Sequence, residues 1–366
     1  MSDPYVEIII LNWCGLADTK SCLNSVFAQS YSNFGVTVVD NCSPDGSFQA
    51  LTEWAETACS PVGNANSTEN DLLAAALAAD APSGFSVHDQ AVHGAESAVP
   101  CNPRWLNLIK AEQNLGFGAG NNIGMKAAID KFDADMASGD RYIWILNNDT
   151  VVEKKCLSAL VTCATSMKER EERVGIVCSK VKYLAQPNIF QGIGGAFNKW
   201  TFRSSHFGGL EPDIGQYDDE GWRDHIDYPI GAAMFVSEAF VREVGMICED
   251  HFLYYEELDW MARAKSTSFK LGYAWQAVIY HKEAASTGAT HSIKNKSRFS
   301  DYCFLRSRVR YGKKNGPVFL AVAVFVTFLS IISRITSGRF DLASLGLFAS
   351  LDGISTSKRP FFKSLR

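Results

Sequence analysis

The fold of this chain is decided by the stretch Tyr142-Ile143-Trp144-Ile145-Leu146-Asn147-Asn148-Asp149-Thr150-Val151-Val152. Its apolar start has the length of a strand and is rich in β-branched and aromatic residues, which predicts a buried strand. The run stops at two amides and a carboxylate, and open α/β sheets bind ligands at the carboxyl ends of their parallel strands. Asp149 offers a hard oxygen ligand, which suits Mg²⁺ or Mn²⁺. Because the same residues also form ordinary turns, this stretch alone leaves a metal site and a polar turn equally open.

Two earlier apolar runs end in the same way. Val6 to Leu11 is an apolar run, interrupted by Glu7 alone, and is followed by Asn12; Phe34 to Val39 is followed by Asp40 and Asn41. Helical patterns over residues 18–29 and 48–59 alternate with these two runs. Strand, helix, strand, helix predicts an α/β fold with a mostly parallel sheet, so the polar strand ends should share one edge.

Composition restricts the class of protein. The chain has 366 residues, 46% of them hydrophobic, and a formal net charge of -5, which argues against nucleic acid as a partner. Its ten cysteines include no Cys-x-x-Cys pair, a usage that favours buried thiols in a reducing compartment. The first seven residues are polar and acidic, and the apolar run after them is too short for a signal peptide. We therefore expect a cytoplasmic protein.

Residues 60–103 interrupt the strand and helix alternation. They are rich in Ala, Ser, Asn, Asp and Pro, and they are predicted to form a surface insertion with a short helix over 72–79. The sheet resumes at Trp105–Lys110. The glycine-rich stretch 114–124 then leads into a helix, whose N-terminus and close backbone approach would favour a phosphate. A structural turn is an equal alternative for this stretch.

An acidic cluster follows a second turn-and-strand segment at 228–236. Glu256, Glu257 and Asp259 are three carboxylates within four positions, flanked by aromatic residues, and burying them together is costly unless they have a use. One of them could act as a general base beside an acceptor hydroxyl. The alternative is a helix N-terminus whose acids favour the helix dipole. A later strand, 271–280, ends in His281.

The C-terminal region combines a basic helix with an apolar one. The helix predicted over 299–314 carries Arg306 and Arg310 among aromatic residues, and Val318 to Ile332 is almost wholly apolar. This run is shorter than the roughly 20 residues that cross a bilayer. It is predicted to lie on the anionic inner face of the cell membrane. A homodimer interface and a C-terminal core helix are the alternatives.

Seven motifs, taken in order, resemble those of the inverting family 2 glycosyltransferases with the GT-A fold, in particular a bacterial rhamnosyltransferase-like branch. They are Leu11-Asn12-Trp13, Val39-Asp40-Asn41-Cys42-Ser43-Pro44-Asp45-Gly46-Ser47, Asn114-Leu115-Gly116-Phe117-Gly118-Ala119-Gly120-Asn121-Asn122, Leu146-Asn147-Asn148-Asp149-Thr150, Gly231-Ala232-Ala233, Phe252-Leu253-Tyr254-Tyr255-Glu256-Glu257-Leu258-Asp259 and Val278-Ile279-Tyr280-His281. Each motif is modest alone, whereas seven in the family's order are specific.

The resemblance implies an organisation and an activity. Residues 1–295 would form a GT-A domain with a Rossmann-like, mixed and mostly parallel sheet flanked by helices, and residues 296–366 a helical membrane-associated region. The enzyme would transfer a sugar from dTDP-rhamnose or a UDP-sugar to a saccharide or lipid-linked acceptor in bacterial surface polysaccharide synthesis. Its cofactor would be Mg²⁺ or Mn²⁺, and it would be peripheral on the inner face of the membrane.

The resemblance also implies roles for single residues. Those of the nucleotide-sugar pocket would be Asp40, which accepts from the donor base, together with Asn12, Asn41, Asn114, Gly116, Asn121 and Asn148. Asp149 would bind the metal that bridges the diphosphate, and His281 would be a further metal or diphosphate contact. Glu257 stands where most members carry an aspartate base, so the base is open among Glu257, Glu256 and Asp259, and the longer side chain of Glu257 is favoured. Arg306 and Arg310 would contact a lipid-linked phosphate.

Two other functions compete with this hypothesis. A nucleotidyltransferase on a related sheet would carry basic residues in the loop after the first strand, and Asn12-Trp13-Cys14-Gly15 has none. A non-catalytic membrane-associated protein that binds nucleotide sugars is a second alternative. Asn147-Asn148-Asp149 stands where the family has an Asp-x-Asp metal motif, and this reduced motif and the glutamate at 257 are compatible with lost activity. Turnover of labelled nucleotide sugars would separate these alternatives.

Overall fold

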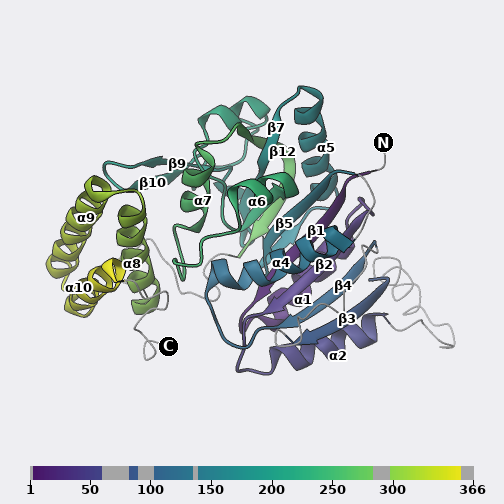
Figure 1. Ribbon diagram of the computed structural model, residues 1–366, viewed down its shortest axis with the longest axis horizontal. Helices are drawn as coiled ribbons and strands as arrows, with labels where there is room; N and C mark the ends of the chain where they lie inside the picture. Colours follow the sequence, from purple (N-terminus) through teal and green to yellow (C-terminus); the bar gives the residue numbers. More distant parts are fainter. Residues whose placement is uncertain (1–2, 60–81, 90–102, 135–138, 283–296, 356–366) are drawn as a thin grey trace.

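The computed structural model describes residues 3–59, 82–89, 103–134, 139–282 and 297–355. In this part of the chain, one large sheet lies between helices, and three C-terminal helices form a separate group beside it (Figure 1).

The large sheet is mixed and mostly parallel. Five neighbouring strands run parallel, then one antiparallel strand is inserted, and a second parallel pair follows. In spatial order the strands are β3 (Gly84–Asp89), β4 (Trp105–Lys110), β2 (Phe34–Asp40), β1 (Tyr5–Asn12), β5 (Arg141–Asn147), β11 (Ala233–Ser237), β7 (Arg173–Tyr183), β12 (Phe269–His281) and β6 (Thr150–Val152), with β8 (Gln186–Gly192) paired to β7. The sheet confirms the predicted α/β fold class.

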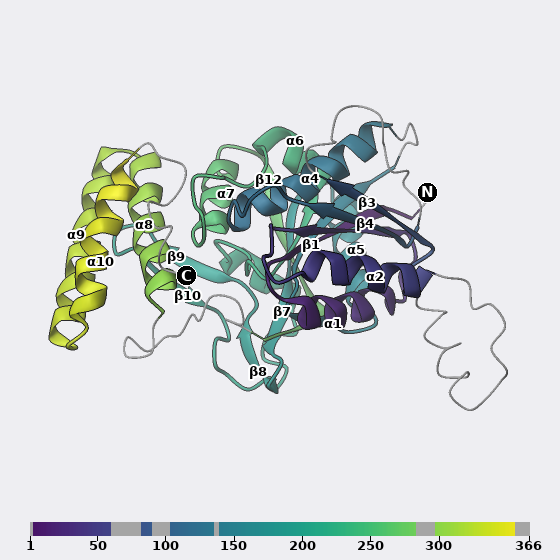
Figure 2. The same ribbon diagram turned by 90° about the horizontal axis from the view of Figure 1, so that it is seen from below.

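Helices cover both faces of this sheet (Figure 2). One face carries α1 (Leu16–Phe27), α2 (Ser47–Cys59) and α5 (Cys156–Glu169), and the other carries α4 (Phe117–Ala134), α6 (Glu238–Val244) and α7 (Glu256–Ala264). Strand β5 shows why its sequence has no polar alternation. Trp144 packs into the first layer and Ile145 into the second, so both faces of the strand are apolar. Ser237 caps the N-terminus of α6, because its side chain accepts from Phe240 N.

Strand β3 corrects the prediction for the insertion. Residues 84–89 pair in parallel with β4 at one edge of the sheet, whereas the sequence predicted irregular surface structure there. The strand is short, and only Phe85 and Val87 alternate with polar neighbours, so its period was too brief to stand out. The helix predicted over 72–79 lies outside the described residues.

The C-terminal group consists of α8 (Arg298–Lys314), α9 (Pro317–Thr336) and α10 (Phe340–Ile354). Buried ion pairs join the three helices: Arg334 of α9 to Asp301 of α8, at 2.7 Å, and Arg306 of α8 to Asp352 of α10, at 2.9 Å. The pairing of Arg334 lets α9 run beyond the predicted end at Ile332. Its 20 residues give it the length and apolar composition of a membrane span. The predicted run, Val318 to Ile332, was apolar but too short for one.

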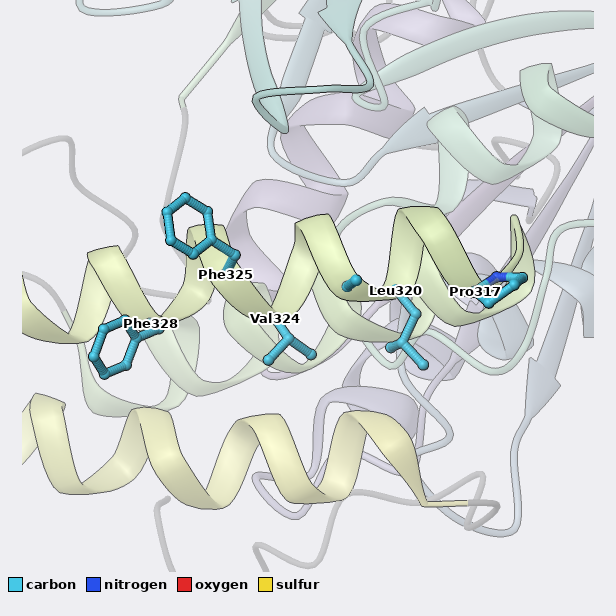
Figure 3. Close-up of a pocket in the computed structure, with 6 residues that line it drawn as sticks. Pro317, Leu320, Val324, Phe325 and Phe328 are labelled. Atoms are coloured by element: carbon cyan, nitrogen blue, oxygen red, sulfur yellow. The ribbon is translucent and has the colours of Figure 1, made fainter.

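The outer faces of α9 and α10 are apolar. Exposed large side chains on the two helices are Val318, Val324, Phe325, Phe328, Leu329, Ile332, Ile335, Phe340, Leu347, Phe348, Leu351 and Ile354. An open hollow of about 560 Å³ follows one side of α9, where Pro317, Val324 and Phe328 lie in line (Figure 3). All of its lining residues belong to this single helix, so it is part of a surface and not an enclosed ligand site.

A small hairpin of the sheet domain packs against these helices. It is formed by β9 (Gly195–Asn198) and β10 (Arg203–His206) and extends toward α8 and α9 (Figure 1). The Phe197 ring lies 5.5 Å from the ring of Tyr311 in α8 and 6.3 Å from that of Tyr255, which directly precedes α7. Phe202 joins the same cluster. We call these four rings the aromatic bridge.

Candidate active site

Three strands bring their polar ends to one edge of the sheet. Asn12 at the end of β1 lies opposite Asp40 at the end of β2, and Asn147 at the end of β5 lies opposite Leu11. Because β1, β2 and β5 are parallel neighbours, their carboxyl ends meet there, as ligand sites of such sheets require.

Asp40 is held by a buried network at this edge. Asn12 Nδ2 donates to Asp40 Oδ2 at 2.7 Å, and the backbone N–H of Ser43 donates to Oδ1 at 2.9 Å. Asn12 Oδ1 in turn accepts from Thr19 Oγ1 at 2.8 Å. The Asn148 amide also donates to Thr19, at 3.0 Å. These bonds fix the predicted nucleotide-binding residues Asn12, Asp40 and Asn148 in one cluster.

The glycine-rich stretch lies against this cluster. Asn41 Nδ2 donates to Asn114 Oδ1 at 3.3 Å and to the carbonyl of Gly116 at 3.2 Å. Gly116 has a φ of +88°, and a Cβ added there would lie 2.3 Å from the carbonyl oxygen of Phe252. Only glycine fits this approach. In the first turns of α4, Asn121 is buried, and no described residue forms a hydrogen bond with its Oδ1.

Asp149 and His281 meet because β6 leaves β5 to pair with β12. Asn148 and Asp149 form a two-residue turn, after which Thr150 lies opposite His281. Asp149 Oδ1 lies 3.0 Å from His281 Nε2. The turn is fixed by the backbone, since Lys282 N donates to the Asp149 carbonyl at 2.9 Å.

The chemistry of this pair fits a divalent metal ion. His281 Nδ1 lies 2.8 Å from Gln191 Oε1, which can only accept, so Nδ1 carries the proton. Nε2 of the same ring lies beside the Asp149 carboxylate, so one nitrogen and one oxygen that can bind a metal ion are adjacent. Asp149 and His281 would hold Mg²⁺ or Mn²⁺ and leave the remaining positions to phosphate oxygens.

Glu256 and Glu257 begin α7 after a strained turn. Tyr254 and Tyr255 both have left-handed backbones, with φ of 71° and 75°, an arrangement that aromatic residues rarely adopt. Glu256 is 3% exposed, and within the described part of the chain its Oε1 has no hydrogen-bond partner. Burial, assisted by the charge of Glu257, raises the pKa of Glu256 well above its usual range. Burial also raises the pKa of Glu257.

Glu257 lies near the end of β5. A Cβ added to Gly231 would be 3.8 Å from the Glu257 carboxyl group. The next residue, Ala232, accepts from Asn147 N at 2.9 Å. Gly231 and Ala232 therefore link Glu257 to Asn147, which ends β5 just before the turn that carries Asp149.

The third acidic residue has a different environment. Asp259 is buried, and its carboxylate accepts from Lys314 Nζ at 2.9 Å and from Arg263 Nε at 3.1 Å. His251 and Lys314 lower its pKa despite its burial. Asp259 thus joins α7 to the end of α8, and its carboxylate is occupied by cations.

Arg306 and Arg310 lie in the helical group, away from the strand ends. Arg306 is fully buried against Asp352, and Arg310 Nη2 donates to the carbonyls of Asp352 and Ser355, each at 3.4 Å. In this arrangement both guanidinium groups stabilise the packing of α8 on α10. A contact to a lipid phosphate would require these bonds to break.

The structure adds residues that the sequence did not indicate. Gln191 orients His281 from β8, 90 positions earlier in the chain, and no local pattern relates the two. Gly231 lies beside Glu257. Thr19 did carry a signal, because it is a polar residue on the apolar face of its helix, in line with Cys22 and Val26.

No protein-family model matches this chain. Among curated proteins, it is 20% identical over 267 residues to the low-salt glycan biosynthesis hexosyltransferase Agl10 of Haloferax volcanii, which covers 69% of this chain and 77% of the relative. Among solved structures it is similar to the mannosyltransferase PcManGT from Pyrobaculum calidifontis in complex with GDP-Man and Mn²⁺, with a TM-score of 0.47 and 11% identity over 98% of this chain and 83% of that one. It is also similar to S. aureus TarS, with a TM-score of 0.47 and 13% identity over 96% of this chain and 49% of that one.

Proposed function

We propose that this chain is an inverting glycosyltransferase with a GT-A fold, of the family 2 rhamnosyltransferase-like kind. It transfers a sugar from a nucleotide diphosphate sugar to a saccharide or lipid-linked acceptor. The observation that carries the proposal is the pair Asp149–His281, together with the Glu257 carboxyl group beside Gly231, whose neighbour Ala232 accepts from Asn147 N at the end of β5. The sequence similarity to a hexosyltransferase supports sugar transfer. dTDP-rhamnose is the first donor to test, and UDP-sugars are the next.

The donor nucleotide is assigned to the polar edge formed by β1 and β2. Asp40 and Asn12 are fixed there by buried hydrogen bonds, and Asn41 holds the glycine-rich stretch beside them. Asn121 contributes a buried carbonyl oxygen that has no protein partner among the described residues. A donor with N–H or O–H groups at this edge would satisfy that oxygen, and its diphosphate would extend toward Asp149.

Glu257 supplies the base in this proposal. Its carboxylate accepts the proton of the acceptor hydroxyl while the hydroxyl oxygen forms a bond to the anomeric carbon. The bond from that carbon to the diphosphate oxygen breaks, and its electron pair leaves with the nucleoside diphosphate. Attack from the face opposite to the leaving group inverts the anomeric configuration. A divalent ion at Asp149 and His281 supplies positive charge for the diphosphate.

Membrane attachment belongs to the same proposal. The exposed apolar faces of α9 and α10 would lie on the inner face of the cell membrane and bring the enzyme to a lipid-linked acceptor. Both helices pack on α8, which carries Tyr311 of the aromatic bridge. A cytoplasmic, peripheral enzyme of surface polysaccharide synthesis would have this layout.

Turnover of labelled nucleotide sugars tests the proposal. With Mn²⁺ and saccharide acceptors, Glu257→Gln should lower kcat by about 10²–10⁴-fold because the base is lost. Donor binding should be retained. A base acts in its deprotonated form, and burial raises the pKa of Glu257. On the acid side, wild-type kcat/KM should therefore fall at a pH above the ordinary glutamate pKa of about 4.3.

Two further variants sharpen this experiment. Asp149→Ala should abolish the metal dependence of donor binding, and Glu53→Gln, on an exposed face of α2, should behave as wild type. Wild-type turnover in Glu257→Gln would refute Glu257 as the base. Donor binding by the wild type without turnover on any acceptor would favour a binding protein instead.

A further inference from the structure

A second cluster of metal-ligating side chains lies apart from the Asp149–His281 pair. Cys248 and His251 come from the loop between α6 and α7, and Asp259 comes from α7. One ligand atom from each of these three residues lies within 4.8 Å of the other two. It is the single such group of three among the described residues.

His251 gives an independent sign of a missing ligand. Its side chain is 0% exposed, yet neither ring nitrogen has a hydrogen-bond partner among the residues that the structure describes. The nearest acidic atom, Asp259 Oδ1, is 3.8 Å from Nε2 and beyond hydrogen-bond distance. An imidazole buried without partners is costly, because both nitrogens have lost water.

The loop that carries Cys248 and His251 is held rigidly. The Asn122 amide donates to the Ile247 carbonyl at 2.8 Å and accepts from Ile247 N at 3.1 Å. Arg263 donates to the carbonyls of Val244 and Met246, each at 2.7 Å. The residues just before Cys248 are therefore fixed without any help from Cys248 itself. Such preorganisation is what a metal site needs.

Asp259 is oriented by the same arginine. Arg263 Nε binds Oδ2 of Asp259, which leaves Oδ1 directed to the cluster. A metal-bound carboxylate whose second oxygen is hydrogen-bonded in this way has the outer support that metal sites show.

Lys314 marks the place of a cation in this cluster. Its ammonium lies 2.7 Å from Cys248 Sγ and 2.9 Å from Asp259 Oδ1. The lysine side chain is 33% exposed, so its flexible stem can move the ammonium into solvent. A metal ion with two charges would then interact with the thiolate and carboxylate more strongly than the ammonium does.

We propose that Cys248, His251 and Asp259 form a binding site for Zn²⁺. Sulfur, imidazole nitrogen and carboxylate oxygen are the ligands that Zn²⁺ takes, and a water molecule would complete the tetrahedron. Binding releases the thiol proton of Cys248 to solvent and displaces the Lys314 ammonium, and thiolate and carboxylate together neutralise the ion. The site fastens the α6–α7 loop to α7, two residues beyond Glu257. The inference stands on this cluster and does not depend on the proposed reaction.

Metal titration of the full chain, stripped with a chelator, tests the site. Zn²⁺ affinity is measured by competition with a chromogenic chelator, and Co²⁺ serves as a probe because thiolate ligation gives it a charge-transfer band. Cys248→Ser should remove the band and weaken Zn²⁺ binding at least about tenfold. Cys163→Ser, which changes another partly buried cysteine, should leave both unchanged. An Asp149→Ala background excludes the other metal pair.

Lys314→Gln gives a test with the opposite sign. It keeps all three ligands and removes the competing ammonium, so Zn²⁺ should bind more tightly than to the wild type. This variant decides the question even if Cys248→Ser fails to fold. Absence of the Co²⁺ band in the wild type, its persistence in Cys248→Ser, or unchanged or weaker Zn²⁺ binding in Lys314→Gln would overturn the proposal.

Discussion

At the scale of single residues, the most unusual side chain is Glu256. It is 3% exposed, lacks a partner for Oε1, and lies beside a second glutamate, so its charged form is disfavoured in the folded state. A folded-state pKa above the unfolded value means that the native protein binds the proton more tightly. Stability is then lost as pH rises from the unfolded pKa, near 4.3, toward the higher folded value.

Glu256→Gln should therefore stabilise the protein at pH 7. A neutral amide avoids the cost of a buried charge, and the free energy of unfolding should rise by at least about 1 kcal/mol, since one pKa unit corresponds to 1.36 kcal/mol. Urea unfolding at several pH values measures this gain, which should shrink as pH falls below about 4.3.

The exposed Glu53 provides the control for this prediction. Glu53→Gln should stay within about 0.5 kcal/mol of the wild type at every pH, as surface substitutions usually do. A Glu256→Gln protein that is less stable than the wild type at pH 7 would show that the carboxyl group has a favourable interaction there.

Sequence indicated the residue types of the site better than their partners. Asp40, Asp149 and His281 stand at strand ends, and an apolar run that stops at a polar residue is visible in a linear pattern. The Gln191 contact to His281 depends on how β8 pairs with β7, which is a property of the assembled sheet. The burial of Arg306 against Asp352 likewise depends on α10, whose position the basic pattern of α8 does not contain.

At the scale of elements, the glycine-rich stretch and the loop before α7 form one joint. Phe117 N, at the start of α4, donates to the Phe252 carbonyl at 2.8 Å, and Gly116 makes its close approach to the same oxygen. The first turn of α4 and the loop that leads into α7 thus depend on one position without a side chain.

Gly116→Ala should destabilise the protein more than its backbone angle alone explains. A left-handed alanine costs roughly 1–2 kcal/mol, and the added Cβ would also clash with backbone at 2.3 Å. Gly46→Ala is the matched control, because Gly46 has a similar φ of +80° with no atom within 4 Å of the added Cβ.

Thermal unfolding and donor titration measure both glycine variants. We expect Gly116→Ala to lose more stability than Gly46→Ala and to lose donor binding, because the stretch beside Asn41 shifts. Equal losses in the two variants would mean that the loop before α7 moves aside without cost.

Prediction was strongest for elements with long apolar runs and weakest at the edges. Strands β1, β2 and β5 are buried on both faces. Their sequences are therefore mostly apolar, and this pattern predicts buried strands. Strand β3 has one neighbour and a short alternation, so its pairing with β4 decides its structure more than its own sequence does. Helix α9 extends beyond its predicted end, where Arg334 forms a buried ion pair with Asp301 of α8. The sequence of α9 does not contain this partner.

At the scale of the whole molecule, the helical group carries the exposed apolar surface. Truncation after Gly316 would remove α9 and α10, but it would also leave Asp301 and Arg306 buried without their ion-pair partners. Surface substitutions on α9 avoid that damage and test membrane contact more cleanly.

The double variant Phe325→Ser/Phe328→Ser should weaken binding to vesicles that contain anionic lipid. Each exposed phenylalanine would contribute about 1.5–3 kcal/mol on burial, so the loss of both should reduce partitioning by at least tenfold. Sedimentation with vesicles measures the bound fraction. Leu210→Ser/Ile214→Ser, which changes exposed apolar residues outside the helical group, should bind as the wild type does. Unchanged sedimentation of the α9 variant would show that this face has another partner.

The aromatic bridge has a mechanical consequence for how the two parts of the molecule communicate. Phe197 and Phe202 come from the hairpin, Tyr311 lies on α8, and Tyr255 directly precedes α7. Their rings meet edge to face or tilted. A displacement of one of these elements moves the next, because the rings between them are rigid and closely packed. A tilt of the helical group would thus reach the glutamates through side chains, along a route much shorter than the polypeptide between them.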